Sequence, residues 1–180
     1  MRPRLAGPST RRCALLAALM LLPQVARADL AWWLTERFKP AATAYEGLSA
    51  RDIHPAWARF SVLTYAMLPH AAHADVAWMR REGFAFEKDG DFNADGRPDR
   101  ALAGVYRDKA GRTGRFLLVL ERQGDKWRKA FLHTEPGTPG FSIVTGPPGE
   151  VHWGTCMECD AGAVLHPRGR TYAFEKGRGD

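Results

Sequence analysis

The feature that most constrains the fold is an uninterrupted run of five apolar residues, Phe116 to Leu120. A strand that is buried on one face alternates apolar and polar side chains, whereas a strand that is buried on both faces reads as a continuous apolar run. Turn-forming residues bound the run on both sides, at 108–114 and at Gly124-Asp125. The run therefore predicts a central strand whose two faces are both covered.

Shorter strand-like segments surround this central strand, and Gly and Pro residues separate them. They are residues 84–87, 101–106, 126–133, 141–144, 151–153, 163–166 and 171–174. Further turns are expected at 137–140 and 146–149, because Gly and Pro supply the backbone angles that turns require. No helical segments alternate with these strands, so the pattern predicts an antiparallel β-meander over residues 84–175.

The chain before residue 84 has apolar side chains at helical spacing. A first helix is expected from Leu30 to Phe38 and ends before Pro40, since proline lacks the amide donor. A second is expected from about Asp52 to Pro69, and a third over residues 72–81. The predicted fold class is therefore α+β, with N-terminal helices (29–83) packed on a C-terminal antiparallel β-meander sheet.

Residues 1–28 are typical of a cleaved signal peptide. Four arginines precede an apolar run at 14–22, and Ala26-Arg27-Ala28 forms an Ala-x-Ala cleavage site. A run of nine residues is too short to span a bilayer, which needs about 20. Thr10-Arg11-Arg12 also resembles a twin-arginine signal, so both export routes stay open. We expect a single domain, 29–180, that is periplasmic or secreted, with no membrane span after leader cleavage.

The strongly basic composition is mostly a property of this leader. Of the 26 Lys and Arg residues in the chain, five arginines lie in the leader, which contains no acid. The remaining 21 basic residues are balanced by 20 acidic ones. A nucleic-acid-binding protein would carry a basic surface, so nucleic acid is not an expected partner.

Oxygen-bearing side chains recur at alternate positions in the segment 89–99. Asp91, Asn93 and Asp95 precede Gly96, and Asp99 follows three residues later. Ca²⁺ takes six to eight oxygen ligands, and Gly96 permits the turn that brings Asp99 back to the other three. The alternatives are another ion or a metal-free turn in which Asp and Asn bond their own backbone. A bare turn leaves the repulsion between carboxylates uncompensated, so the pattern favours calcium.

Residues 90–107 resemble a single calcium-loop repeat of the FG-GAP and VCBS type, found in integrin-like β-propeller blades. The resemblance implies that the side chains of Asp91, Asn93, Asp95 and Asp99 bind Ca²⁺, together with the backbone carbonyl of Arg97. Asp89 is a candidate extra ligand. The sequence contains one copy of this repeat, whereas a propeller is built from several blades, so the resemblance does not imply a propeller fold. The loop is not an EF-hand. An EF-hand loop has a bidentate Glu at its twelfth position, where this chain has Leu102, and a strand rather than a helix is expected to follow.

Two cysteines, Cys156 and Cys159, remain after the leader is removed. An even number in an exported chain favours a disulfide, in this case one that clasps a hairpin. Zinc would need two more ligands, for which His152 and His166 are candidates. A redox site would place the pair at the start of a helix, whereas a strand-like run follows. The disulfide is the favoured interpretation of the three.

No catalytic signature stands out in the sequence. We therefore expect an exported calcium-binding protein of non-catalytic type, whose partner is an envelope or extracellular protein. One alternative is a metal-dependent hydrolase that combines the loop's cation with His54, His70 or His73. A second alternative is an inhibitor or immunity-type protein that acts against a cell-wall enzyme.

Overall fold

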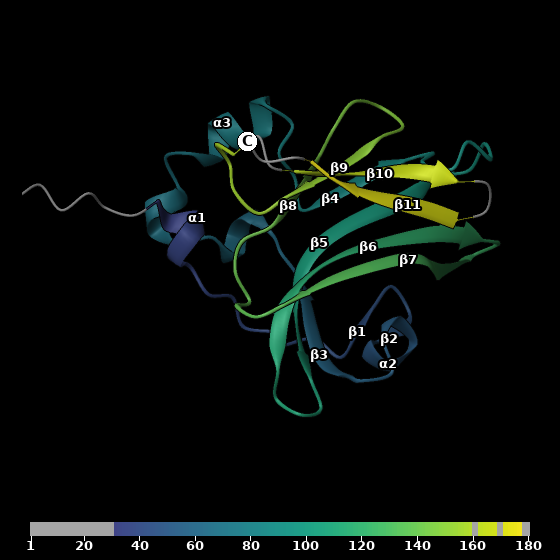
Figure 1. The fold of residues 1–180 in the computed structure, drawn as a ribbon, viewed down its shortest axis with the longest axis horizontal. Coiled ribbons are helices and arrows are strands. Elements are labelled where there is room, and N and C mark those ends of the chain that lie inside the picture. Colours follow the sequence, from purple (N-terminus) through teal and green to yellow (C-terminus); the bar gives the residue numbers. More distant parts are fainter. Residues whose placement is uncertain (1–30, 160–161, 169–170, 178–180) are drawn as a thin grey trace, which may run out of the picture.

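The computed structural model describes residues 31–159, 162–168 and 171–177 (Figure 1). The predicted signal peptide lies outside the described residues. Strands make up 47% of the described residues and helical segments 14%, so the described part of the protein is mostly β. The predicted α+β class is wrong, because no layer of N-terminal helices packs on the sheet in the described chain.

The described chain begins with short helices and strands and continues as a series of longer strands. The elements in chain order are α1 (Trp32–Thr35), β1 (Ala44–Tyr45), β2 (Leu48–Ser49), α2 (Ala50–Ile53), β3 (Trp57–Val62), the 3₁₀ turns η2 (Tyr65–Met67) and η3 (His70–Ala72), α3 (Val76–Arg81), β4 (Glu87–Gly90), β5 (Asp99–Asp108), β6 (Thr113–Gln123), β7 (Lys126–Pro136), β8 (Ile143–Thr145), β9 (Val151–Gly154), β10 (Ala163–Arg168) and β11 (Thr171–Lys176).

The main sheet has the strand order β3-β5-β6-β7, and all neighbouring strands are antiparallel. Strand β4 pairs with the first part of β5, from Asp99 to Leu102, and β3 pairs with the last part, from Gly104 to Asp108. Strands β3 and β4, which are far apart in sequence, therefore lie one after the other along the same edge of β5.

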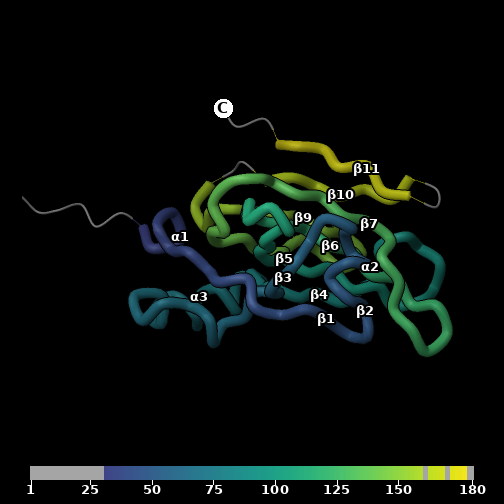
Figure 2. Tube along the Cα trace, turned by 90° about the horizontal axis from the view of Figure 1, so that it is seen from below, coloured from purple at the N-terminus to yellow at the C-terminus, as the bar shows by residue number. Residues whose placement is uncertain are grey.

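A second antiparallel sheet, with the order β11-β10-β9-β8, lies over one face of the main sheet (Figure 1). An isolated bridge between Ala85 and Val144 connects the segment that leads into β4 with β8. Helix α2 and the short β1–β2 hairpin lie on the opposite side of the main sheet (Figure 1). Figure 2 shows α1 and α3 together at one end of the molecule.

Strand β6 is buried on both faces, which confirms the prediction from its apolar run. Phe116 and Leu118 point into a cluster with Ile53 and Trp57, on the side of α2. Leu117 and Val119 point the other way, into a cluster formed with the second sheet. All five residues from 116 to 120 have no exposed surface. The alternation of side chains along a strand explains how one apolar run serves two cores.

The predicted second helix is wrong, because its region contains β3. Trp57 and Phe60 are three residues apart, as in a helix, and both enter the cluster on the α2 side. A register shift between Trp57 and Arg59 makes this possible, because the extra residue of a β-bulge turns the following side chain to the other face. A bulged strand therefore imitates helical spacing.

The two other predicted helices exist but are shorter than expected. Helix α1 covers only Trp32–Thr35, and α3 begins at Val76. Helix α3 ends at Arg81, as predicted, and a cap follows it: Gly83 has φ +74°, and the amide of Phe84 donates to the carbonyl of Met79 at 2.9 Å. The amide of Gly83 donates to Arg80 at 3.3 Å, which completes a Schellman cap.

Gly104 in β5 provides a test of this packing. A methyl group at its Cβ position would lie 2.4 Å from the carbonyl oxygen of Ser61 and 2.4 Å from the ring of Phe116. The carbonyl belongs to the paired strand β3 and has little freedom to move. We expect Gly104→Ala to lower the free energy of unfolding by about 1–3 kcal/mol in urea titrations. Gly154→Ala is the control, since its nearest neighbours are 3.6 Å away. Equal stability of the two variants would contradict this account.

Candidate metal centre

The acidic loop connects two paired antiparallel strands, β4 and β5, and Gly90 lies opposite Asp99 at its base. The side chains of Asp91, Asn93 and Asp95 bend back toward the loop's own backbone. Asp91 accepts hydrogen bonds from the amides of Asp95 at 3.0 Å and Gly96 at 2.9 Å. The loop is therefore folded around the carboxylate of Asp91.

The other two alternating side chains make similar bonds. Asn93 Oδ1 accepts from the amide of Asp95 at 2.9 Å, and Asp95 Oδ1 accepts from the amide of Arg97 at 2.9 Å. Gly96 has φ +80°, the conformation that its position in the pattern predicts. Each carboxylate oxygen has two lone pairs, so these bonds leave capacity for a cation.

Asp99 lies at the base of the loop and is only 1% exposed. Its Oδ2 accepts hydrogen bonds from the amide of Phe92 at 2.9 Å and the hydroxyl of Tyr172 at 3.3 Å. Its Oδ1 is buried and has no hydrogen-bond partner. Burial, reinforced by the charges of Glu121 and Asp95, raises the pKa of Asp99 to about 6. A buried carboxylate with an unpaired oxygen is costly unless a positive charge compensates it.

Sequence reasoning missed three residues that surround Asp99 and Asn93. Glu121 at the end of β6 accepts a hydrogen bond from Asn93 Nδ2 at 3.2 Å, and the guanidinium of Arg128 contacts its other oxygen. Tyr172 comes from β11 in the second sheet. Burial, together with the charge of Asp99, raises the pKa of Tyr172 far above its usual value. Nothing in the sequence links these residues to the loop, because strand pairing and sheet stacking bring them there.

Asp89 lies apart from the other oxygens. It pairs with Arg100 across the β4–β5 ladder, and Arg100 donates to both of its oxygens, at 2.7 and 3.0 Å. Cross-strand partners point to the same face, whereas Asp99 is the neighbour of Arg100 along β5 and points to the opposite face. The pleat of the strand thus separates Asp89 from Asp99.

The residues of the loop fit a hard cation through their chemistry. They supply carboxylate and amide oxygens, the donors that Ca²⁺ prefers, and the unpaired oxygen of Asp99 lies at their base. No group of three or more His, Cys, Asp or Glu side chains in the described ranges is arranged to hold a metal ion. The expected set contains three such side chains, Asp91, Asp95 and Asp99, so the structure does not gather these carboxylates around one point.

Cys156 and Cys159 form a disulfide, with an S–S distance of 2.01 Å and a Cα–Cα distance of 5.5 Å. The pair follows β9 directly and precedes β10, its antiparallel partner, as the predicted clasp of a hairpin requires. The two zinc-ligand candidates lie beside carboxylates instead. His152 Nε2 is 2.9 Å from Glu150, and His166 Nε2 is 3.7 Å from Glu175.

The three histidines of the hydrolase alternative lie away from the loop. His54 lines a pocket with Asp108, at the far end of the ten-residue strand β5 from Asp99. At about 3.3 Å per residue, the two ends are roughly 30 Å apart. The exposed rings of His70 and His73 lie 5.1 Å from each other near α3. Asp75 accepts a hydrogen bond from the indole of Trp32 at 2.7 Å.

Comparisons with known proteins found no match: no family model, no curated protein and no solved structure matches the chain. The resemblance of residues 90–107 to FG-GAP and VCBS repeats stays a prediction that depends on the loop residues themselves. In the part of the chain that the structure describes, no helix is long and apolar enough to cross a membrane.

The pKa of Asp99 predicts a pH dependence of stability when calcium is absent. Its pKa of about 6 in the folded protein lies above the ordinary value of 3.8. Between these values the unfolded chain has lost the proton and the folded chain retains it. Stability should therefore fall as the pH rises from about 4 to about 6, by up to about 3 kcal/mol.

Urea unfolding in EDTA across this pH range tests the effect. We expect Asp99→Asn to remove the fall, because the amide does not ionise. Asp125→Asn, in the exposed β6–β7 turn, is the control and should follow the unsubstituted protein. If the curve for Asp99→Asn runs parallel to that of the unsubstituted protein, this carboxyl does not titrate as proposed.

Proposed function

We propose that the protein is an exported, non-catalytic calcium-binding protein that acts by binding another protein in the cell envelope or outside the cell. The observation that carries the calcium proposal is the buried oxygen of Asp99 with no hydrogen-bond partner. It lies at the base of a loop that collects two more carboxylates and an amide oxygen.

The loop's own backbone orders three of the expected ligands. Its amides hold the side chains of Asp91, Asn93 and Asp95 in place. Side chains that are already ordered lose less conformational entropy when a ligand binds, although these carboxylates would still have to move together around the ion. The side chains of Asp91, Asn93, Asp95 and Asp99, with the carbonyl of Arg97, would hold the ion. Its charge would offset the repulsion among the carboxylates.

Such an ion would order the loop more than it would support the fold. At an extracellular-type affinity of about 10⁻⁴–10⁻³ M and calcium near 1 mM, binding stabilises a protein by only ~0.4–1.4 kcal/mol. Asp99 also accepts from Tyr172, so ordering at the loop reaches β11 in the second sheet. We therefore assign calcium the role of fixing the loop against both sheets.

The partner-binding role is supported by the exposure of the loop. Residues 94–98 are all exposed at its tip, while Asp99 at its base is buried. Calcium would thus present an ordered surface to a partner. The separation between the loop and His54 favours this non-catalytic role over the hydrolase, which would need an imidazole beside the cation.

Calorimetry on the purified protein after EDTA treatment tests the calcium site. We expect saturable binding of about one equivalent of Ca²⁺, in line with a single loop. Asp91→Ala and Asp95→Ala should both abolish it, and Asp125→Ala, which removes an exposed carboxylate outside the loop, should leave it unchanged. Absence of binding at several millimolar calcium would reduce the loop to an Asx-rich turn.

A further inference from the structure

Two exposed arginines, Arg59 on β3 and Arg107 on β5, lie directly opposite each other in the main sheet. Cross-strand partners point to the same face, and their Cβ atoms are about 4.5–5.5 Å apart. This arginine pair lies where the main sheet extends beyond the second sheet, next to the β5–β6 hairpin (Figure 1). Like charges in directly opposite positions destabilise a sheet, so the stability of the fold does not account for the pair.

A β-bulge in β3 creates the arginine pair. The register shift before Arg59 leaves Ala58 without a cross-strand partner, and Arg59 pairs with Arg107. Without the extra residue, Arg59 would lie opposite Tyr106, whose side chain faces the core beneath α2. The bulge brings Phe60 into that core, and it also turns Arg59 to the face on which Arg107 lies.

The neighbours of the arginine pair on this face carry no charge. Strand register gives Arg107 a second cross-strand neighbour, Thr113 on β6. Alternation along the strands adds Val105 on β5 and Ser61 on β3, which also pair with each other. All three neighbours lie in the part of the chain that the structure describes, and none of them can compensate a guanidinium group.

The carboxylate that is nearest along β5 is already engaged. Asp108 follows Arg107 and therefore points to the opposite face, where its oxygens accept hydrogen bonds from the amide and the Nε of Arg112. Every salt bridge between described residues involves side chains outside the arginine pair. Arg59 donates to the carbonyl of Ala41 at 2.7 Å, which uses one of its five N–H donors.

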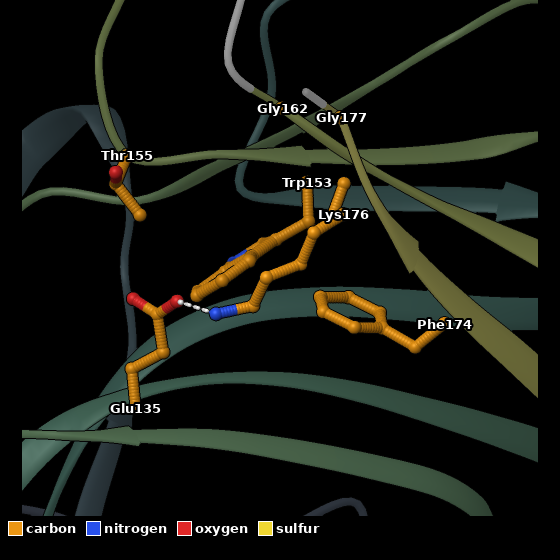
Figure 3. A pocket seen from close by; sticks show the side chains of 8 residues that line it. Glu135, Trp153, Thr155, Gly162, Phe174, Lys176 and Gly177 are labelled. Atoms are coloured by element: carbon orange, nitrogen blue, oxygen red, sulfur yellow. Dashed lines mark ion pairs between the residues drawn. The ribbon is translucent and has the colours of Figure 1, made fainter. Parts of the chain in front are cut away.

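Other cations of the molecule have carboxylate partners. Figure 3 shows one of them, Lys176, whose Nζ lies 3.6 Å from Oε1 of Glu135. Arg100 pairs with Glu87 at 3.0 Å and with Asp89 at 2.7 Å. Natural proteins break local rules of this kind mainly at functional sites. The arginine pair is therefore a candidate contact for a partner that brings negative charge.

We propose that the arginine pair binds an acidic side chain of the partner protein. Two guanidinium groups side by side present planar forks of N–H donors, which match the two oxygens of a carboxylate. The negative charge of the carboxylate also removes the repulsion between the arginines. This inference rests on the proposed role of the chain as a binding protein, and it adds a second contact at the other end of β5 from the calcium loop.

An acidic protein suits this site better than an anionic lipid surface or a nucleic acid. Both of those surfaces attract proteins through many cations that act together. Outside residues 1–28, however, 21 Lys and Arg residues are balanced by 20 Asp and Glu residues. Two arginines among uncharged neighbours of the sheet instead suit a single carboxylate.

Fluorescence anisotropy with a labelled oligoglutamate peptide tests the proposal on the full chain in EDTA. We expect saturable binding at low ionic strength. Arg59→Gln and Arg107→Gln should each weaken it about ten- to a hundredfold, as for the loss of a charge-assisted hydrogen bond. Arg51→Gln removes the same charge from α2, on the opposite side of the main sheet, and should bind the peptide normally.

Urea unfolding tests the repulsion between the arginines without any partner. We expect Arg107→Gln to raise the urea midpoint at low ionic strength, because the substitution removes a like charge opposite Arg59. The gain over the unsubstituted protein should disappear in about 1 M sodium chloride, where the Debye length is about 3 Å. Arg51→Gln is again the control and should show no gain.

Three results would overturn the proposal. One is the absence of oligoglutamate binding; vesicles of phosphatidylglycerol that bind in its place would assign the pair to a lipid surface. Another is an equal loss of affinity in Arg51→Gln and Arg107→Gln, which would indicate general charge attraction. The last is a lower urea midpoint for Arg107→Gln, which would mean that the pair supports the fold. None of these results bears on calcium, since the solutions contain EDTA.

Discussion

The structure depends on the burial of β6 on both faces. Phe116 and Leu118 contribute to the core beneath α2, while Leu117 and Val119 contribute to the core beneath the second sheet. Two cores on one strand require that both flanking layers be present together. The strand thereby couples the N-terminal segment with the C-terminal sheet. Burial of each such side chain is worth about 1.5–3 kcal/mol, which makes this strand the main apolar connection between the layers.

The two polar regions between the sheets lie at opposite ends of that apolar contact. Asp99, Glu121 and Tyr172 lie where β5, β6 and β11 meet at the loop. Arg115 and Glu135 lie where the sheets separate at the other end. The first region contains a buried acceptor without a partner, the Oδ1 of Asp99. This unpaired acceptor is the physical reason why we assign a cation to the loop.

The disulfide and the short cap of α3 secure the parts of the chain that strand pairing does not hold. Cys156–Cys159 closes the connection between β9 and β10. Closing so short a loop stabilises the fold by no more than about 2 kcal/mol, so its effect is to shape the connection locally. Trp32 and Trp33 pack against the cluster that includes Phe141, and the indole of Trp32 donates to Asp75 at 2.7 Å. The tryptophan pair therefore belongs largely to the packing at this end of the molecule.

The sequence by itself determined the approximate positions of the strands after the loop, the two-faced burial of 116–120, the loop with Gly96 in its turn, and the pairing of Cys156 with Cys159. These depend on local patterns: alternation, Gly and Pro at turns, and close spacing of cysteines. The sequence placed the strand before the loop at 84–87, whereas β4 covers Glu87–Gly90. Only the tertiary structure decided that 57–62 forms a strand, because its bulge imitates helical spacing. Only the tertiary structure brought Glu121 and Tyr172 to Asp99, and His133 to Trp153. Those neighbours come from strand register and the stacking of sheets, interactions between residues that are distant along the chain and leave no local pattern in it.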